Sequence, residues 1–556
     1  MTNNEIAGIF SMLSKLIDIN GGDSFKAKSY SSVSFAVENS PAELSEIDPA
    51  TLASIKGIGA SSAKKITELL STGKLEQLED LLFSTPAGVV EMLNIKGLGP
   101  KKINTVWKEM ELESIGELLY ACKENRLKLY KGFGEKTQQA IIDNIEFYLG
   151  NKGNYLYAQT IFAAEQFSEL LKKLFPAKKV FVTGAFAMQA EVITQLEYIV
   201  EENADRIEGI LSRQPGFELT EKNEESIMYK TGAGIHVKIY SAEKNPVEKL
   251  VETSSSPAFF KLLGEAHPGE APAEDEKDYF SRRKLPFIPA FLREDAEISS
   301  TGKDYNTHLQ PTDVKGLIHC HSDWSDGNNS IEEMAKAAME RGMEFMAISD
   351  HSKTAAYAGG LQEDRVKAQH QYIDELNTKL APFRIFKSIE SDILGDGSLD
   401  YSDNILSTFD LVIASVHSNL KMTEEKAMAR LLTAIENKYT TILGHMTGRL
   451  LLSRPGYPLD HKKIIDACAA NHVVIELNAN PNRLDMDWRY IKYALDKGVL
   501  ISIDPDAHSI KGIDDICYGV FSAQKAMLPK EKNLSSFSLK EFEAFIENRK
   551  KVKGIS

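Results

Sequence analysis

The chain has 556 residues, of which 42% are hydrophobic and 26% are charged, as in ordinary globular proteins. At about 150 residues per domain, this length predicts three to four domains. The formal net charge of −15 argues against a generally basic nucleic-acid coat, but it permits DNA binding through backbone amides and local lysines.

Several sequence features bear on the compartment. No run of about 18 apolar residues is present, and the N-terminal residues lack the pattern of a signal peptide. The four cysteines are scattered without a C-x-x-C pair, which argues against a disulfide framework or a cysteine zinc site. We therefore expect a cytoplasmic protein that has no membrane contact.

Residues 1 to about 150 have the pattern of successive helices separated by short glycine turns. Three turns are alike, at residues 55–59, 95–99 and 130–134, and each precedes a helical stretch that contains lysine. This internal repetition is the clearest signal in the first third of the chain. Each turn could also be only a tight connection between helices.

Residues 155–250 combine a helix, predicted over 159–174, with strand candidates at 180–183, 196–200 and 235–240. The mixture predicts a small α+β domain. About fifty residues rich in Ser, Pro, Glu and Ala follow, and we interpret them as the tail of this domain running into a linker.

From residue 316 onward, strand candidates alternate with amphipathic helices such as 331–341 and 424–437. Seven βα units in a row predict a parallel sheet, either open or closed into a barrel. The strands are expected at 317–319, 345–350, 385–390, 411–417, 441–445, 473–478 and 500–504.

Histidine is concentrated in this second half, since only His236 and His267 of the twelve histidines precede residue 300. Six of the seven strands carry His, Asp or Glu at or just past the C-terminal end, where the loops of a βα barrel converge. A single histidine at a strand end is more often structural, but recurrence at six strands favours a metal site. The candidate ligands are His319, His321, Asp326, His351, Glu390, His417, His445, Asp506 and His508.

Imidazoles and carboxylates suit zinc, manganese or iron, and nine ligand groups exceed the needs of one ion. We therefore expect two or three divalent ions. Two cations about 3.5–4 Å apart can clamp the attacking and leaving oxygens of a phosphoryl displacement, so phosphoester hydrolysis is predicted. Arg449 and Arg483 are candidates for holding phosphate oxygens, although either could be a surface ion-pair partner.

Six segments around these residues resemble the motifs of PHP-type phosphoesterases: 319–327, 348–352, 389–394, 415–418, 444–449 and 506–509. The resemblance implies a distorted seven-stranded βα barrel. Leu317 stands where that family often has Asp, which removes a carboxylate expected to orient a ligand. The resemblance assigns one metal to His319, His321, Glu390 and Asp506, a second to Glu390, His417 and His445, and a third to Asp326, His351 and His508.

The glycine turns resemble helix-hairpin-helix elements, which present backbone N–H groups to a DNA phosphate. The module order resembles that of bacterial family X DNA polymerases, which join a polymerase-β-like half to a PHP nuclease. By this resemblance, residues 1–82 and 83–152 are helical domains, 153–295 a palm with a thumb-like region, 296–315 a linker and 316–556 the PHP domain. The DNA-contact candidates are Gly57, Gly59, Lys64, Lys65, Gly97, Gly99, Lys101, Lys102, Gly132 and Gly134.

The palm departs from the polymerase pattern, which needs a Gly-Ser turn for nucleotide phosphates and three carboxylates for two magnesium ions. The turn here is Gly184-Ala185, and the carboxylate positions hold Gln195, Glu197 and His236. One carboxylate cannot assemble two hard cations that require oxygen ligands, so we expect nucleotidyl transfer to be lost. The palm would then serve as a spacer or a DNA-binding surface.

Lys65 corresponds to the Schiff-base lysine of lyase-competent relatives, although a solvated or phosphate-contacting lysine is the favoured interpretation. Overall we expect a monomeric, metal-dependent DNA phosphodiesterase in repair, a 3′–5′ exonuclease or 3′-end processing enzyme that uses manganese or zinc. It would hold DNA mainly through the phosphate backbone. Three alternatives stay open: an active family X repair polymerase, a small-molecule phosphatase and a non-catalytic DNA-binding scaffold.

Overall fold

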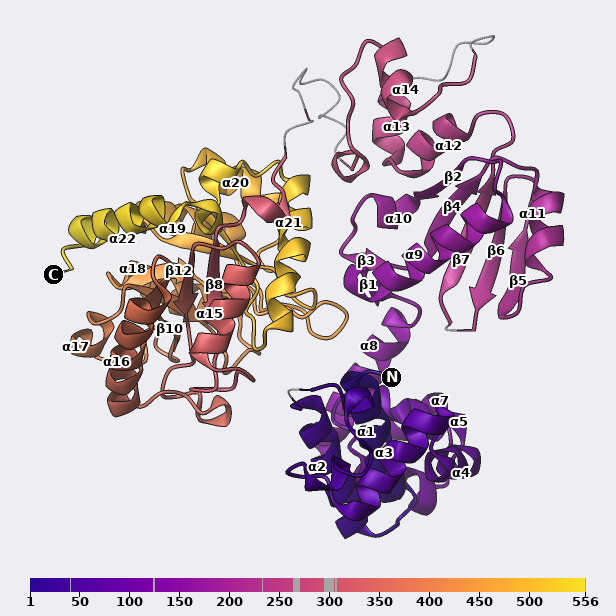
Figure 1. The fold of residues 1–556 in the computed structure, drawn as a ribbon, viewed down its shortest axis with the longest axis horizontal. Helices are drawn as coiled ribbons and strands as arrows, with labels where there is room; N and C mark the ends of the chain where they lie inside the picture. The colour runs from indigo at the N-terminus through magenta and orange to yellow at the C-terminus, as the bar shows by residue number, and fades with distance from the viewer. Residues whose placement is uncertain are drawn as a thin grey trace. The chain divides into compact units, whose positions relative to one another are not determined.

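The computed structural model describes residues 1–40, 42–123, 126–232, 234–263, 271–294, 305 and 308–555 (Figure 1). The chain divides into two compact units, residues 1–152 and 153–556. Among the residues that the structure describes, no helix combines the length and apolar character required for a bilayer span.

The first unit is helical and contains the three repeated glycine turns. Its α-helices are α1 (Asn3–Ile19), α2 (Ser24–Glu38), α3 (Ala60–Thr72), α4 (Glu76–Ser84), α5 (Ala87–Glu91), α6 (Pro100–Asn104), α7 (Ile115–Lys123) and α8 (Glu135–Asn151). The turns directly precede α3, α6 and α8, so the helices predicted after each turn are present.

All three turns have the same backbone geometry. Gly57, Gly97 and Gly132 have φ values of +93°, +88° and +92°, a conformation that only glycine adopts at little cost. A side chain at Gly57 would also place its Cβ 2.8 Å from that of Ala36. The second glycine of each turn caps the helix that follows. The three turns are therefore alike in backbone conformation as well as in sequence.

The second unit begins with a small α+β domain. Its five-stranded sheet has the order β2-β4-β7-β6-β5, and the β4–β7 pair is parallel while the other pairs are antiparallel. The strands are β2 (Val180–Thr183), β4 (Leu196–Val200), β5 (Phe217–Lys222), β6 (Ser226–Thr231) and β7 (His236–Ser241), with helices α9 (Tyr157–Leu174) and α11 (Ala204–Leu211). Strands β5 and β6 were not expected. Five of the six residues of β5 are exposed, so this strand has no apolar pattern to reveal it.

The stretch interpreted as a tail and linker contains helical structure. It forms α12 (Pro246–Thr253), α13 (Pro257–Leu263) and α14 (Glu276–Arg282), which share a small core that includes Phe259 and Phe280. Arg293 is fully buried beside this core and pairs with Glu276 at 2.6 Å. The low-complexity composition concealed a folded subdomain because a few aromatic residues suffice to build its core.

The C-terminal part is a nearly closed barrel of seven parallel strands in sequential order. The strands are β8 (Gly316–Cys320), β9 (Phe345–Ile348), β10 (Arg384–Asp392), β11 (Leu411–Ser415), β12 (Thr440–Leu443), β13 (Val474–Asn478) and β14 (Ile501–Asp504). The first and last strands meet where the His321 amide donates to the Ala507 carbonyl at 2.8 Å. This contact decides between the open sheet and the barrel that the sequence left as alternatives.

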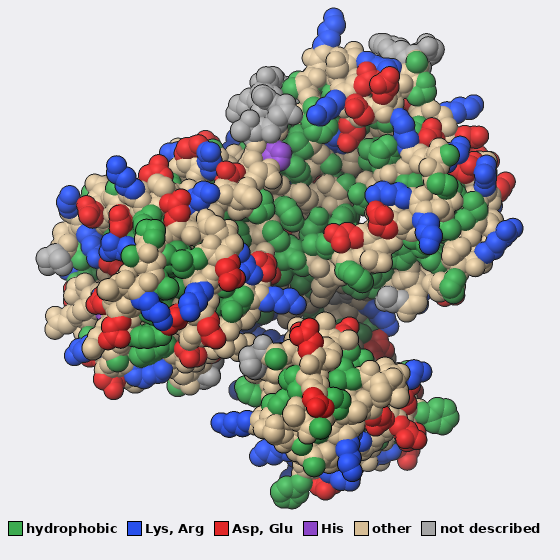
Figure 2. All heavy atoms as spheres, viewed as in Figure 1, with side chains coloured by type: hydrophobic (Ala, Val, Ile, Leu, Met, Phe, Trp, Pro, Cys, Tyr) green, Lys and Arg blue, Asp and Glu red, His purple; other side chains and the backbone are tan. Residues whose placement is uncertain are grey.

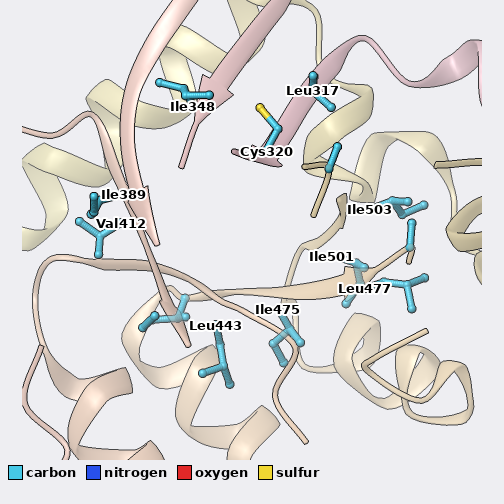
Figure 3. Packing of buried hydrophobic residues seen from close by; sticks show 14 of the residues in the cluster. Leu317, Cys320, Ile348, Ile389, Val412, Leu443, Ile475, Leu477, Ile501 and Ile503 are labelled. Atoms are coloured by element: carbon cyan, nitrogen blue, oxygen red, sulfur yellow. The ribbon is translucent and has the colours of Figure 1, made fainter. Parts of the chain in front are cut away.

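Helices surround the barrel strands. They are α15 (Ile331–Glu340), α16 (Glu363–Leu380), α17 (Asp403–Leu406), α18 (Glu424–Glu436), α19 (His461–Asn471), α20 (Ile491–Asp496), α21 (Ile516–Lys525) and α22 (Leu539–Lys553). Because helices cover the outside and side chains fill the inside, almost every strand residue is buried. Figure 3 shows labelled members of the main core on all seven strands, among them Leu317, Ile389 and Ile503.

A second core closes the barrel end near the start of the strands. Phe542 of α22 is fully buried and stacks on Phe345 of β9, with ring centroids 4.3 Å apart. Phe386 of β10 contacts the Phe542 ring edge-on, with ring centroids 4.8 Å apart. We call Phe345, Phe386 and Phe542 the apolar plug. Polar residues gather at the opposite end of the barrel, where the strands finish.

Replacement of Phe542 by Ala should lower the free energy of unfolding of the barrel by about 3–5 kcal/mol, because it leaves a cavity between buried rings. Peptide-resolved hydrogen exchange on the full chain measures this loss in the barrel strands alone. Val552→Ala on the same helix, where the side chain is 55% exposed, is the control and should stay within about 0.5 kcal/mol. Equal protection of the barrel-strand amides in the two variants would contradict a stabilising role of the plug.

Candidate metal centre

The nine candidate ligands all lie at the end of the barrel where the strands finish. His319 and Glu390 belong to strands β8 and β10, and the other seven follow a strand in its loop. Strands β9, β11 and β12 end two or more residues earlier than predicted. Because strand pairing ends before these positions, His351, His417 and His445 lie in loops at the mouth of the barrel.

His319 reaches the mouth through a local distortion of β8. Its φ is +56°, and the pairing of β8 with β9 shifts register between Ile318 and Cys320. Such a bulge re-aims a side chain, here away from the outer core to which Leu317 and Cys320 belong.

Glu390 is the centre of the cluster. Its Oε1 atom lies 3.0 Å from His417 Nε2, 3.0 Å from His445 Nε2 and 3.3 Å from His319 Nε2. Its Oε2 atom lies 2.9 Å from His351 Nδ1. One carboxylate, only 1% exposed, therefore contacts four imidazoles, one from strand β8 and three from the loops after β9, β11 and β12.

Two further groups extend the cluster. His321 Nε2 lies 3.1 Å from Asp506 Oδ1, and Asp326 lies 3.5 Å from both His351 Nε2 and His508 Nε2. Three sets of potential ligand atoms each fall within 4.8 Å of one another: His321, Asp326, His351 and His508; His319, His321 and Asp506; His351, Glu390 and His417. The structure thus brings together all nine residues that the sequence singled out.

The donor atoms fit divalent metal ions. Two buried polar atoms of the cluster have no hydrogen-bond partner among the described residues: His321 Nδ1 and His445 Nδ1. Unpaired buried polar groups cost free energy, which bound cations would relieve at those atoms that face them. Mixed imidazole and carboxylate donors suit manganese, zinc or iron.

Carboxylates outside the cluster orient its histidines. Glu476 of β13 contacts the Nδ1 atom of His319, and its other oxygen accepts from the His445 amide at 3.0 Å. Asp392 Oδ1 lies 2.5 Å from His417 Nδ1. A carboxylate behind a metal-binding imidazole fixes the ring and its tautomer. Glu476 therefore supplies at His319 the support whose absence Leu317 had suggested.

Glu476 and its neighbour Asn478 were not among the expected site residues. Strand β13 was the one predicted strand without a candidate ligand at its end. Two polar residues that alternate with apolar ones in a fully buried strand are the signal that could have identified them.

The electrostatics show how the cluster is balanced without cations. Burial disfavours a charge on His351 and His417, but the adjacent Glu390 outweighs it, and the pKa values rise to about 10 and about 9. Burial and the neighbouring His508 lower the pKa of His321 to about 3. Protons on His351 and His417 thus offset the buried carboxylates, and a metal ion must displace them.

The two candidate arginines have different positions. Arg449 donates to Glu191 at 2.6 Å and to the carbonyl of Arg483 at 2.9 Å, and it also contacts the carbonyl of Leu484. Its guanidinium therefore pairs with protein groups, as in the ion-pair alternative, and its role as a phosphate ligand stays a prediction. Arg483 is instead the arginine at the cluster, with Nε 3.7 Å from Asp506 Oδ2.

The altered palm residues do lie together. Strands β4 and β7 are parallel neighbours, with Leu196 opposite Val237, so Gln195 and His236 fall at one end of the pair. Glu197 accepts from the Tyr240 hydroxyl at 2.8 Å and is opposite Lys238. A Cβ on Gly184 would lie 2.1 Å from Glu197 Oε1, so this carboxylate rests against the Gly184 turn.

In the helical unit, Lys64 and Lys101 are exposed, whereas Lys65 and Lys102 are half-buried. The Lys102 ammonium donates to the Gly97 carbonyl at 3.0 Å, within its own hairpin. Basic and acidic side chains are interspersed on the face of the molecule in Figure 2. On this face, DNA would have to be held by local groups such as the helix N-termini, since no broad basic patch is visible there.

Binding of a divalent cation, with Mn²⁺ as the probe, should strengthen between about pH 7 and about pH 9. His351 and His417 have raised pKa values of about 10 and about 9, so they are protonated at the lower pH and the ion must compete with their protons. Calorimetric titration near pH 7 in two buffers of different ionisation enthalpy should also detect proton release. Equal affinity at both pH values, with no dependence on the buffer, would contradict this charge balance.

Comparison with known proteins agrees with this architecture. Residues 1–75 match a helix-hairpin-helix domain, residues 89–146 a SAM-like helix-hairpin-helix tandem, and residues 318–480 a PHP domain. Two proteins named "Probable phosphatase" match shorter parts of the chain. The protein from Syntrophotalea carbinolica is 30% identical over 29% of this chain and 64% of its own length, and that from Acetivibrio thermocellus is 31% identical over 27% and 58%.

A much longer match includes the palm. The chain is 31% identical to the "DNA polymerase/3′-5′ exonuclease PolX" of Bacillus subtilis, over 98% of this chain and 100% of that protein. The resemblance seen in the motifs is therefore confirmed along the whole sequence. The chain belongs to the PolX family, the bacterial family X DNA polymerases that carry helix-hairpin-helix modules and a C-terminal PHP domain.

Proposed function

We propose that the protein is a metal-dependent 3′–5′ exonuclease or 3′-end processing enzyme that acts in DNA repair. The observation that carries the proposal is the cluster of nine His, Asp and Glu side chains around Glu390 in the PHP barrel. Similarity to the Bacillus subtilis enzyme over its full length supports DNA as the substrate.

Two or three manganese or zinc ions would be held by the three ligand sets that the resemblance assigns. When bound, such ions lower the pKa of a water nucleophile and stabilise charge on the attacking and leaving oxygens. The protein's own residues orient the site. Glu476 and Asp392 hold the rings of His319 and His417, and Arg483 would hold a non-bridging phosphate oxygen.

The helix-hairpin-helix modules bind DNA, and we propose that they do so through the phosphate backbone. Three glycine turns with φ near +90° each open a helix whose first N–H groups have no partner within the helix. The exposed Lys64 and Lys101 lie on the helices that follow two of these turns. Such contacts carry no sequence preference, as suits an enzyme that processes ends.

We also propose that nucleotidyl transfer is lost. Glu197 is the one carboxylate at the three metal-binding positions, it accepts a hydrogen bond from Tyr240, and Lys238 is its cross-strand neighbour. A carboxylate against the Gly184 turn would repel the phosphates that this turn binds in an active polymerase. The lysine further disfavours a divalent cation.

His319→Ala should reduce release of nucleotides from DNA 3′ ends by more than about 100-fold, beyond the usual loss when an outer partner of a ligand is removed. His472→Asn is the matched control, because His472 is exposed at the end of α19 and its left-handed backbone, with φ +54°, suits Asn. An exonuclease assay with Mn²⁺, with metal content measured by elemental analysis, makes the comparison. If the alanine variant hydrolyses DNA as fast as the wild type, the activity does not come from the cluster around His319. The alternative of a non-catalytic DNA-binding scaffold would then be favoured.

Primer extension on gapped DNA with dNTPs and either Mg²⁺ or Mn²⁺ should give shortened primers and no extended products. The reason is the missing pair of carboxylates at Gln195 and His236. Robust synthesis would restore the polymerase alternative. Faster turnover of a sugar phosphate than of DNA, measured in parallel, would instead favour the small-molecule phosphatase.

A further inference from the structure

The palm domain contacts the nuclease domain through the segment that follows its altered nucleotide-binding turn. Lys525 of α21 donates to the Met188 carbonyl at 2.8 Å and pairs with Glu294 at 2.5 Å. Its side chain is only 1% exposed. Tyr157 stacks on Phe186 of the palm at 4.8 Å and meets Phe521 of α21 edge-on at 6.0 Å.

Glu191 provides the charged part of this contact. Its carboxylate lies 2.6 Å from Arg449 Nη2 and 3.7 Å from Arg489 Nη1, and it is only 15% exposed. A charge-assisted hydrogen bond at such a shielded position is stronger than a surface ion pair. Glu191 therefore fixes the orientation of the Arg449 guanidinium.

Arg449 passes this constraint to the metal centre. Its Nε donates to the Arg483 carbonyl at 2.9 Å, and its Nη2 contacts the Leu484 carbonyl. The same loop is anchored at Asp485, which accepts from the Thr447 amide at 3.0 Å. Arg483, on this loop, reaches Asp506 at 3.7 Å. Contacts thus run without interruption from the palm to the metal cluster.

We propose that Glu191 is a positioning residue of the nuclease: through Arg449 it holds the 483–484 backbone so that Arg483 presents its guanidinium to the substrate phosphate. The inference rests on the proposed exonuclease function and assigns a role to the palm. The segment beside the old nucleotide-binding turn no longer needs to bind nucleotide and instead supports the neighbouring active site. A palm without nucleotidyl transfer then remains necessary for DNA hydrolysis.

The test is a set of variants assayed for 3′–5′ hydrolysis of single-stranded DNA with Mn²⁺. Glu191→Ala and Arg449→Ala should each lower kcat about tenfold, within the usual range for outer partners of an active site. The double variant should be no slower than Arg449→Ala, because Glu191 acts only through that arginine. For the same reason, Glu191→Ala should have no effect in an Arg483→Ala background.

Mn²⁺ affinity and the thermal midpoint separate positioning from general damage, and both should stay unchanged in Glu191→Ala. Glu191→Gln, which keeps a hydrogen-bond acceptor, should recover part of the loss. Asp205→Asn is the control, since Asp205 is a 90% exposed palm carboxylate paired with Lys222.

Full activity in Glu191→Ala, or multiplicative losses in the double variant, would overturn the inference while the exonuclease function stands. A wild-type protein that leaves every DNA end intact would overturn the proposed function itself. If Glu191→Ala unfolds, the milder Glu191→Gln decides, since a fall in kcat with normal stability is still expected there. Wild-type kcat in this folded variant would equally overturn the inference.

Discussion

The barrel mouth depends on one constraint, the charge of a buried carboxylate. Glu390 is 1% exposed and lies on the third of seven strands, so it cannot be solvated by water. An isolated buried carboxylate is very costly, and only nearby positive charge makes the arrangement tolerable. Protons on His351 and His417 supply that charge without metal, and divalent cations would supply more. The buried negative charge that lowers the stability of the fold thus also creates affinity for metal ions.

Closure of the barrel is what makes this cluster possible. His319 belongs to the first strand and His321 directly follows it, whereas Asp506 and His508 follow the last strand, nearly two hundred residues later. They meet because the β8 segment pairs with residue Ala507 beyond β14. The apolar plug at the other end, formed by Phe542, Phe345 and Phe386, contributes the stability that a mouth filled with charged groups cannot. The apolar residues that stabilise the barrel therefore lie at one end of its axis, and the candidate ligands lie at the other.

The palm contacts the PHP barrel beside its altered polymerase positions. Its five-stranded sheet is intact, and Glu197, at one of the polymerase positions, accepts a hydrogen bond from Tyr240. The adjacent Glu191 is engaged with Arg449 of the PHP barrel. Selection for hydrolysis alone would preserve this contact without preserving the nucleotide site.

The amino-acid sequence by itself determined the seven barrel strands, the nine residues of the cluster around Glu390 and the three glycine turns. These features depend on local signals: apolar runs, polar residues at strand ends and glycine at positive φ. Tertiary structure alone decided that the sheet closes, that Glu476 supports His319, and that Arg449 serves the palm while Arg483 faces the cluster. It also revealed β5 and the helices after β7, whose composition is too polar or too irregular to predict. The closure of the sheet, the Glu476–His319 contact and the Arg449–Glu191 contact each depend on a partner far away in the sequence. A local pattern contains no information about which distant group will neutralise a charge or accept a hydrogen bond.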